Sequence, residues 1–166
     1  MNFAMKIVAV AVMGFSLNAM AIQKDITVNA NVDPSLDMTL SDAQQLPESV
    51  NMQYIPGNGL APYAMQAKIW SNAYSDVNIA LVNNVLLYDR AGSATTVPLT
   101  ISYGGTALTT TNTKLLKTVL FPGGATTIAQ GSIAQELKFS QTTPGILPAG
   151  NYTGVVSIVL TQATSA

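Results

Sequence analysis

Apolar and polar side chains alternate with a period of two through most of this chain, and turn residues interrupt the alternation about every ten residues. Alternation of this kind gives each segment one buried face and one solvated face, which is typical of β-strands. The predicted strands span residues 64–70, 77–81, 85–88, 97–103, 133–140 and 152–161. Many short strands with frequent turns predict an all-β protein, a β-sandwich of the immunoglobulin kind.

Three places allow more than one interpretation. Leu36, Met38 and Leu40 alternate as a short strand would, but the residues after them resemble a loop. Residues 112–121 have apolar side chains at helical spacing, so this window is a short helix or a turn. Trp70 lies on the polar side of its strand, which indicates either a half-exposed cover residue or an interface residue.

Residues 22–34 form the most regular of these alternating segments. Ile22, Ile26, Val28, Ala30 and Val32 occupy its even positions, interrupted only by a lysine, and polar residues fill the odd positions. Pro34 ends the strand because its ring removes the amide donor. Alternation does not identify the strand's partner, so the segment could pair within its own domain or with another molecule.

The residues before this strand have the pattern of a cleaved signal peptide. A short start carrying Lys6 precedes an apolar run from Ile7 to Leu17, and Ala19 and Ala21 form the small-x-small motif of a cleavage site. The eleven-residue run is much shorter than the roughly 20 residues that a membrane-spanning helix needs. We therefore expect residues 1–21 to be removed after Ala21, leaving 22–34 at the amino terminus.

Charge and cysteine content limit the possible partners. Without residues 1–21, six basic and eight acidic residues remain, so the net charge is close to −2. This balance predicts no nucleic-acid partner. The chain has no cysteine although it carries an export signal, so packing and backbone pairing alone must stabilise it.

Catalytic, metal and cofactor sites receive little support from the sequence. The chain lacks histidine and cysteine, which removes the usual general base, the thiol nucleophile and most transition-metal ligands. Its glycine pairs precede no lysine-containing phosphate loop, and no calcium-loop motif is present. We expect no enzyme activity, no metal and no cofactor.

The last predicted strand is very apolar and only a short polar tail follows it. Residues 155–160 read Val-Val-Ser-Ile-Val-Leu, and no further strand can form after them. If this strand is central, another segment must cover its open side, because an exposed apolar edge promotes aggregation. The strand at 22–34 has suitable alternation and length to do so.

Four segments resemble the major subunits of colonisation-factor fimbriae, which belong to the alternate chaperone-usher pathway of enteric bacteria. These segments are 24–34, 63–72 (Tyr-Ala-Met-Gln-Ala-Lys-Ile-Trp-Ser-Asn), 98–105 (Pro-Leu-Thr-Ile-Ser-Tyr-Gly-Gly) and 149–161. The resemblance is weakest at 107–131.

The resemblance implies that residues 35–166 form an incomplete immunoglobulin-like pilin domain, which donor-strand exchange completes. The donor side chains would be Ile22, Ile26, Val28, Ala30 and Val32. The carboxy-terminal strand that docks the chaperone and lines the groove would present Tyr152, Gly154, Val156, Ile158 and Leu160. The implied partners are copies of the same chain, a periplasmic chaperone, an outer-membrane usher and a tip adhesin, and the implied location is a cell-surface fimbrium reached through the periplasm.

Two other functions remain open at the level of sequence. One is a minor or tip subunit that binds a host glycan, although about 145 residues leave no room for an additional receptor domain. The other is a self-complete secreted β-sandwich that binds a small ligand.

Overall fold

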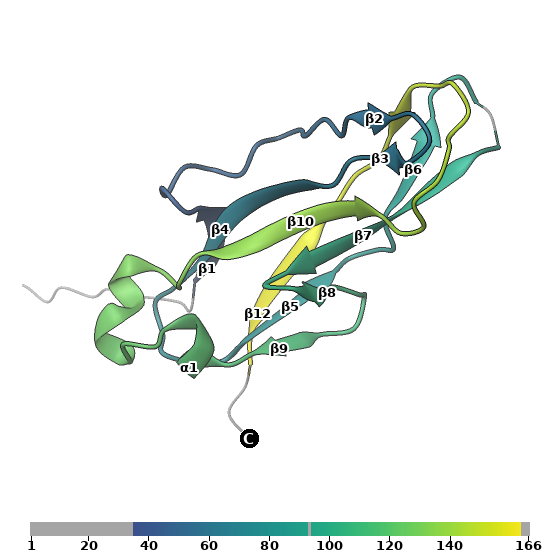
Figure 1. The fold of residues 1–166 in the computed structure, drawn as a ribbon. Helices are drawn as coiled ribbons and strands as arrows, with labels where there is room; N and C mark the ends of the chain where they lie inside the picture. The colour runs from purple at the N-terminus through teal and green to yellow at the C-terminus, as the bar shows by residue number, and fades with distance from the viewer. Residues whose placement is uncertain (1–34, 93, 164–166) are drawn as a thin grey trace, which may run out of the picture. The chain divides into compact units, whose positions relative to one another are not determined.

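Two antiparallel sheets pack against each other in the computed structural model, which describes residues 35–92 and 94–163 (Figure 1). The first sheet has the order β1-β4-β10-β7-β6-β11, with β8 paired to β7. Its strands are β1 (Leu36–Leu40), β4 (Tyr63–Ser71), β6 (Leu86–Asp89), β7 (Thr96–Tyr103), β8 (Thr106–Ala107), β10 (Gln135–Gln141) and β11 (Tyr152–Thr153).

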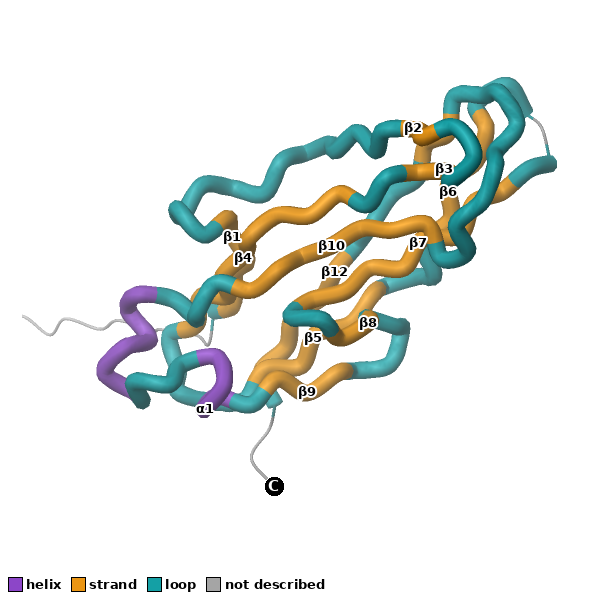
Figure 2. The backbone as a smooth tube through the Cα atoms, viewed as in Figure 1, coloured by secondary structure: helices purple, strands orange, loops and turns teal. Residues whose placement is uncertain are grey.

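The second sheet is smaller and has the order β12-β5-β9. Its strands are β5 (Val77–Leu81), β9 (Thr113–Leu115) and β12 (Ile158–Gln162). A separate hairpin pairs β2 (Tyr54–Ile55) with β3 (Gly59–Leu60). The helix α1 (Lys117–Leu120) and the 3₁₀ helix η1 (Ala125–Gln130) lie at the end of the domain opposite the hairpin (Figures 1 and 2).

The core lies between the two sheets. Ile69 and Ile101 from the first sheet and Ile79 from the second are fully buried. Leu120 and Phe121, at the end of α1, are also buried and close one end of the core. Burial of such aliphatic and aromatic side chains is the main favourable term in folding a domain of this size.

Most of the predicted strands are confirmed within one or two residues. The prediction at 77–81 coincides with β5, and those at 64–70, 85–88, 97–103 and 133–140 correspond to β4, β6, β7 and β10. The alternating residues from Leu36 to Leu40 do form a strand, β1. Trp70 is half-buried and its Nε1–H donates to Thr39 Oγ1 at 2.8 Å, so it covers the outer face of the β1–β4 pair.

The prediction of one continuous last strand is wrong. Residues 152–153 pair with β6 in the first sheet, whereas residues 158–162 pair with β5 in the second, and 154–157 cross between them. The helical interpretation of 112–121 is confirmed in part, because α1 occupies only 117–120 and the residues before it form β9. The sequence did not predict η1.

Within the described residues, no helix is long and apolar enough to cross a membrane.

Candidate functional site: an open groove beside the last strand

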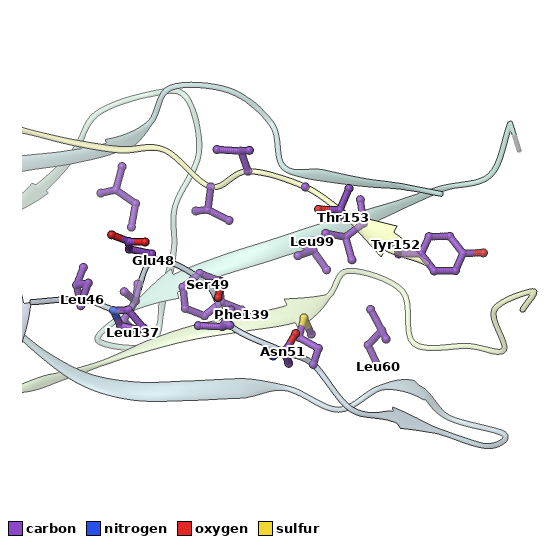
Figure 3. A pocket seen from close by; sticks show the side chains of 18 of the residues that line it. Leu46, Glu48, Ser49, Asn51, Leu60, Leu99, Leu137, Phe139, Tyr152 and Thr153 are labelled. Atoms are coloured by element: carbon purple, nitrogen blue, oxygen red, sulfur yellow. The ribbon is translucent and has the colours of Figure 1, made fainter. Parts of the chain in front are cut away.

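A long groove with a volume of about 1420 Å³ runs along the domain (Figure 3). One wall is formed by residues 36–38 of β1 together with 46–52 and 54, and the other wall is formed by residues 147–156 and 158–160. Side chains of the first sheet form its floor, among them Met65, Leu99, Leu137 and Phe139. Leu46 and Glu48 lie toward one end of the groove, and Leu60 and Tyr152 lie toward the other.

The groove exposes the flank of the core. Apolar side chains along it are half-buried and pack directly on core residues; they are Leu36, Met38, Leu46, Met52, Met65, Leu99, Val156, Ile158 and Leu160. In a closed sandwich a further strand would cover such positions. The apolar surface that remains in water here is therefore available to an inserted segment.

Within the part of the chain that the structure describes, β12 is an edge strand whose backbone is paired on one side only. Its inner side pairs with β5: Val82 N–H donates to Ser157 O and Ala163 N–H donates to Asp76 O, each at 2.9 Å. In an antiparallel ladder, residues whose N–H and C=O groups point to the partner strand alternate with residues whose N–H and C=O groups point away from it. The N–H and C=O groups of Ile158 and Leu160 therefore point to the open side of β12.

The strand β1 is the edge of the other sheet and follows the same rule. Ser41 N–H donates to Gln66 O at 2.9 Å, so the odd-numbered residues of β1 bond to β4. The even-numbered residues turn their backbone groups away from β4, and two of those amides have local acceptors. Leu40 N–H donates to Gln44 O, and Met38 N–H donates to Asp37 Oδ1, each at 2.8 Å.

All five residues predicted on the carboxy-terminal strand line the groove. Tyr152, Val156, Ile158 and Leu160 are half-buried, and the intervening Val155, which also borders the groove, is 82% exposed. Gly154 lies where the chain crosses between sheets, and a Cβ there would collide with the carbonyl oxygen of Leu86. Glycine at this position allows the close approach to β6.

The other predicted site residues lie outside the described residues. These are the donor positions Ile22, Ile26, Val28, Ala30 and Val32 and the cleavage positions Ala19 and Ala21.

Sequence reasoning missed the wall formed by residues 46–54. Val50, Met52 and Tyr54 alternate with Asn51, Gln53 and Ile55 as in a strand, but only Tyr54 and Ile55 are paired, in the β2–β3 hairpin. Leu46 and Met52 still turn toward the core, so the alternation did indicate a face without indicating a strand.

Three charged residues line the groove among the described residues, and they are placed unequally. Asp37 and Glu48 lie near the end that contains Leu46, because Gln45 bridges to Thr39 of β1. Arg90 lies near the Tyr152 end, where its backbone N–H donates to Asn151 O at 2.8 Å. The lining therefore carries two carboxylates near one end and one guanidinium near the other, where the buried Asp89 accepts a hydrogen bond from Asn151 N–H at 3.2 Å.

The geometry favours a peptide ligand over a small molecule. The groove volume exceeds the range of about 300–1,000 Å³ that is usual for small-molecule sites. The described residues contain no group of three or more acidic side chains placed to hold a metal ion. A long apolar trough between two strand edges matches the known mode of binding in which an extended peptide adds a strand.

Comparison with protein families decides the class. The sequence model of the "CS1 type fimbrial major subunit" family matches residues 22–161. The chain belongs to this family.

Individual members of the family agree with that assignment. The chain is 34% identical over 158 residues to the CFA/I fimbrial subunit of Escherichia coli, a match that covers 92% of each chain. It is 29% identical over 162 residues to the CS1 fimbrial subunit of Escherichia coli, with 94% of each chain covered. Its fold is similar to that of the CooA pilin from enterotoxigenic Escherichia coli, with a TM-score of 0.66, 23% identity, and 79% and 89% of the two chains covered.

The recognition made from the sequence is thus confirmed, as is the all-β, incomplete immunoglobulin-like fold. The chain is a structural subunit of a cell-surface fimbria, reached through the periplasm, and its family is not a class of enzymes. The alternatives of a glycan-binding tip subunit or a self-complete ligand-binding sandwich are not favoured.

Proposed function

We propose that this fimbrial subunit polymerises by strand exchange, in which residues 22–34 of one copy fill the groove of another. The observation that carries the proposal is the open side of β12. There, backbone groups of Ile158 and Leu160 face away from β5 beside half-buried apolar side chains. An inserted strand would pair with these backbone groups and would also cover the half-buried side chains, because it supplies hydrogen-bond partners and apolar side chains together.

The period of the donor strand supports this proposal. Its even positions Ile22, Ile26, Val28, Ala30 and Val32 alternate with polar residues. On the groove wall, Val156, Ile158 and Leu160 recur with the same period and are half-buried against the core; Tyr152 lies on β11 and Gly154 lies where the chain crosses between the sheets. Burying each Val or Ile contributes about 1.5 to 3 kcal/mol before the cost of ordering the strand.

Charge favours one polarity of insertion. Lys24 lies near the start of the donor segment and Asp33 near its end. If the donor runs antiparallel to β12, Lys24 approaches Glu48 and Asp37, and Asp33 approaches Arg90. The opposite polarity brings Lys24 to Arg90 and Asp33 to Glu48 and Asp37; Asp25, next to Lys24, offsets part of its charge in either polarity. Exposed pairs of this kind contribute at most about 1 kcal/mol each, but they select orientation during encounter.

This arrangement generates a filament. The donor of one copy occupies the acceptor of a second, and the second copy's own donor remains available for a third. A head-to-tail contact that does not close on itself produces an open polymer.

The same groove supports a role for accessory proteins. Before assembly, the open edge of β12 and the exposed core flank promote aggregation unless another strand covers them. We therefore assign the first occupant to a periplasmic chaperone, and we assign ordered addition to an outer-membrane usher and the filament end to a tip adhesin. We also assign residues 1–21, with cleavage after Ala21, to the export signal; the family match begins at residue 22.

Replacing Val28 with aspartate tests the exchange. Val28 lies outside the 35–166 domain, so the substitution should leave that domain's fold and its groove intact. A charge in a desolvated groove is strongly unfavourable, so the V28D copy should accept a donor strand but fail to donate one. Mixing V28D with the wild type should shorten filaments in proportion to its share, as counted by electron microscopy. Filaments of normal length from V28D alone would refute the proposal.

A further inference from the structure

Both ends of the described domain carry exposed apolar side chains. At the α1 end, Leu116, Val119 and Ile133 are 45–52% exposed; we call these three the α1 patch. At the end where the groove reaches Tyr152, the exposed apolar residues are Tyr54, Ile55, Tyr88 and Ile146, which we call the β6 patch. Isolated exposed apolar residues are common on proteins, whereas clusters more often mark interaction surfaces.

The α1 patch surrounds one short piece of backbone. Leu116 precedes the helix and Val119 lies within it, while Ile133 N–H donates to Leu120 O at 2.9 Å. The three side chains therefore come from neighbouring backbone even though η1 separates Leu120 from Ile133 in the sequence.

The α1 patch also lies beside the point where the described chain begins. Ser35 N–H donates to Asn72 Oδ1 at 3.0 Å, and Lys117 N–H donates to Asp76 Oδ1 at 2.9 Å. Residues 72–76 form the single connection between β4 and β5, so the start of β1 and the start of α1 are anchored to the same five residues.

The β6 patch surrounds the exit of the groove. Tyr88 pairs with Thr153 in the β6–β11 ladder, and Ile146 lies in the loop between β10 and β11. Leu60 N–H donates to Gln141 Oε1 at 2.9 Å, which holds the β2–β3 hairpin against the end of β10. Figure 1 shows β2, β3 and β6 together at the end away from α1.

Residues 33–35 connect the donor strand to the domain. This connection is too short to keep the α1 end of one copy away from the β6 end of the copy that accepts its donor strand. With the antiparallel polarity, Val32 of the following copy lies at the Tyr152 end of the preceding copy's groove. Only Asp33, Pro34 and Ser35 separate Val32 from Leu36, a span of at most about 14 Å when fully extended. The α1 end of the following copy must then lie close to the β6 end of the preceding one.

We propose that consecutive subunits dock end to end, with the α1 patch of the following copy on the β6 patch of the preceding copy. The inference rests on the proposed strand exchange and adds a second contact to it. The occupant of each patch is another copy of this chain, because the short connection formed by residues 33–35 holds that copy next to the patch. The contact joins two different surfaces, so it repeats along the filament without closing.

Cross-linking tests the docking, and the chain suits it because it contains no cysteine. Val119→Cys and Ile146→Cys introduce one thiol at each end of the domain. Filaments of the double variant, treated after assembly with a short flexible bifunctional thiol reagent, should yield a ladder of covalent oligomers in denaturing gels. Each single variant should yield no ladder.

A matched control pairs Val119→Cys with Val82→Cys. Val82 has a similar exposure of 55%, but it lies beside Ser157, midway along the domain. This pair should not give a ladder. Normal filaments of the Val119–Ile146 double variant that show no ladder, or an equal ladder from the control pair, would overturn the end-to-end docking while leaving strand exchange intact. Failure of strand exchange itself, scored by V28D, would overturn both.

Discussion

Asp76 shows how one side chain joins three elements at the α1 end. Its Oδ1 accepts the N–H of Lys117 at the start of α1, and its Oδ2 lies 2.9 Å from Lys114 Nζ, on β9. The residue itself immediately precedes β5. The backbone hydrogen bond from Lys117, followed by that of the Lys114 ammonium, lowers the pKa of the Asp76 carboxyl from its ordinary 3.8.

This lowered pKa predicts how stability depends on pH. Because the folded pKa lies below the unfolded one, the contribution of Asp76 is fully present above pH 3.8 and is lost as pH falls through the folded pKa. Asp76→Asn removes the charge but keeps an acceptor for Lys117. The variant should have a lower melting temperature than wild type at neutral pH, and the difference should shrink as the pH falls below 3.8. A constant difference across that range would contradict the account.

At the scale of elements, sequence periodicity predicted strands well where both faces of a strand were regular. β5 was predicted to the residue because Val77, Ile79 and Leu81 all point into the core. The wall at 46–54 was not predicted, because Pro47 and the absence of ladder partners leave it irregular. The division of the last strand was also missed, since a change of sheet alters hydrogen-bond partners without altering the alternation of side chains.

The groove residues of β12 could be identified, but their geometry could not. Alternation separates Val156, Ile158 and Leu160, which are half-buried against the core, from Val155 and Val159, which are 82% and 40% exposed at the border of the groove. Only the ladder with β5 shows that the first set also turns its backbone groups to the open edge. The positions of the charged residues along the groove likewise became known only from the structure, because Asp37, Glu48 and Arg90 are distant in sequence.

Two valines provide a matched pair of substitutions. Val156→Asp places a charge in the groove and should abolish acceptance of a donor strand, while Val82→Asp places the same charge on a 55% exposed side chain that does not line the groove and should leave acceptance unchanged. Binding of a synthetic peptide of residues 22–34 to each purified variant measures the difference. Circular dichroism controls for folding, since both domains should remain β-rich. Equal binding by the two variants would show that the donor does not enter this groove.

At the scale of the whole molecule, the protein must be stabilised without covalent cross-links. It has no cysteine, and the described domain leaves one side of its core against the groove. In the proposed exchange, a strand from another copy would complete the sandwich and link the two copies at the same time. Folding and polymerisation would then bury the same apolar surface. For this reason the leading strand and the last strand were the parts of the sequence that indicated most about function.

The most direct test of this account is the thermal stability of a chain that carries its own donor at the other end. Residues 22–34 are deleted from the amino terminus and a copy is attached after Ala166 through a flexible linker. Since β12 ends at Gln162, the attached strand can return antiparallel along the groove. Each kcal/mol of net stabilisation should raise the melting temperature by about 2–8 °C. If the donor strand completes the domain, the monomer with the attached strand should melt at a higher temperature than the chain without it, and an attached copy that carries Val28→Asp should give no such gain. Equal melting temperatures for all three proteins would contradict it.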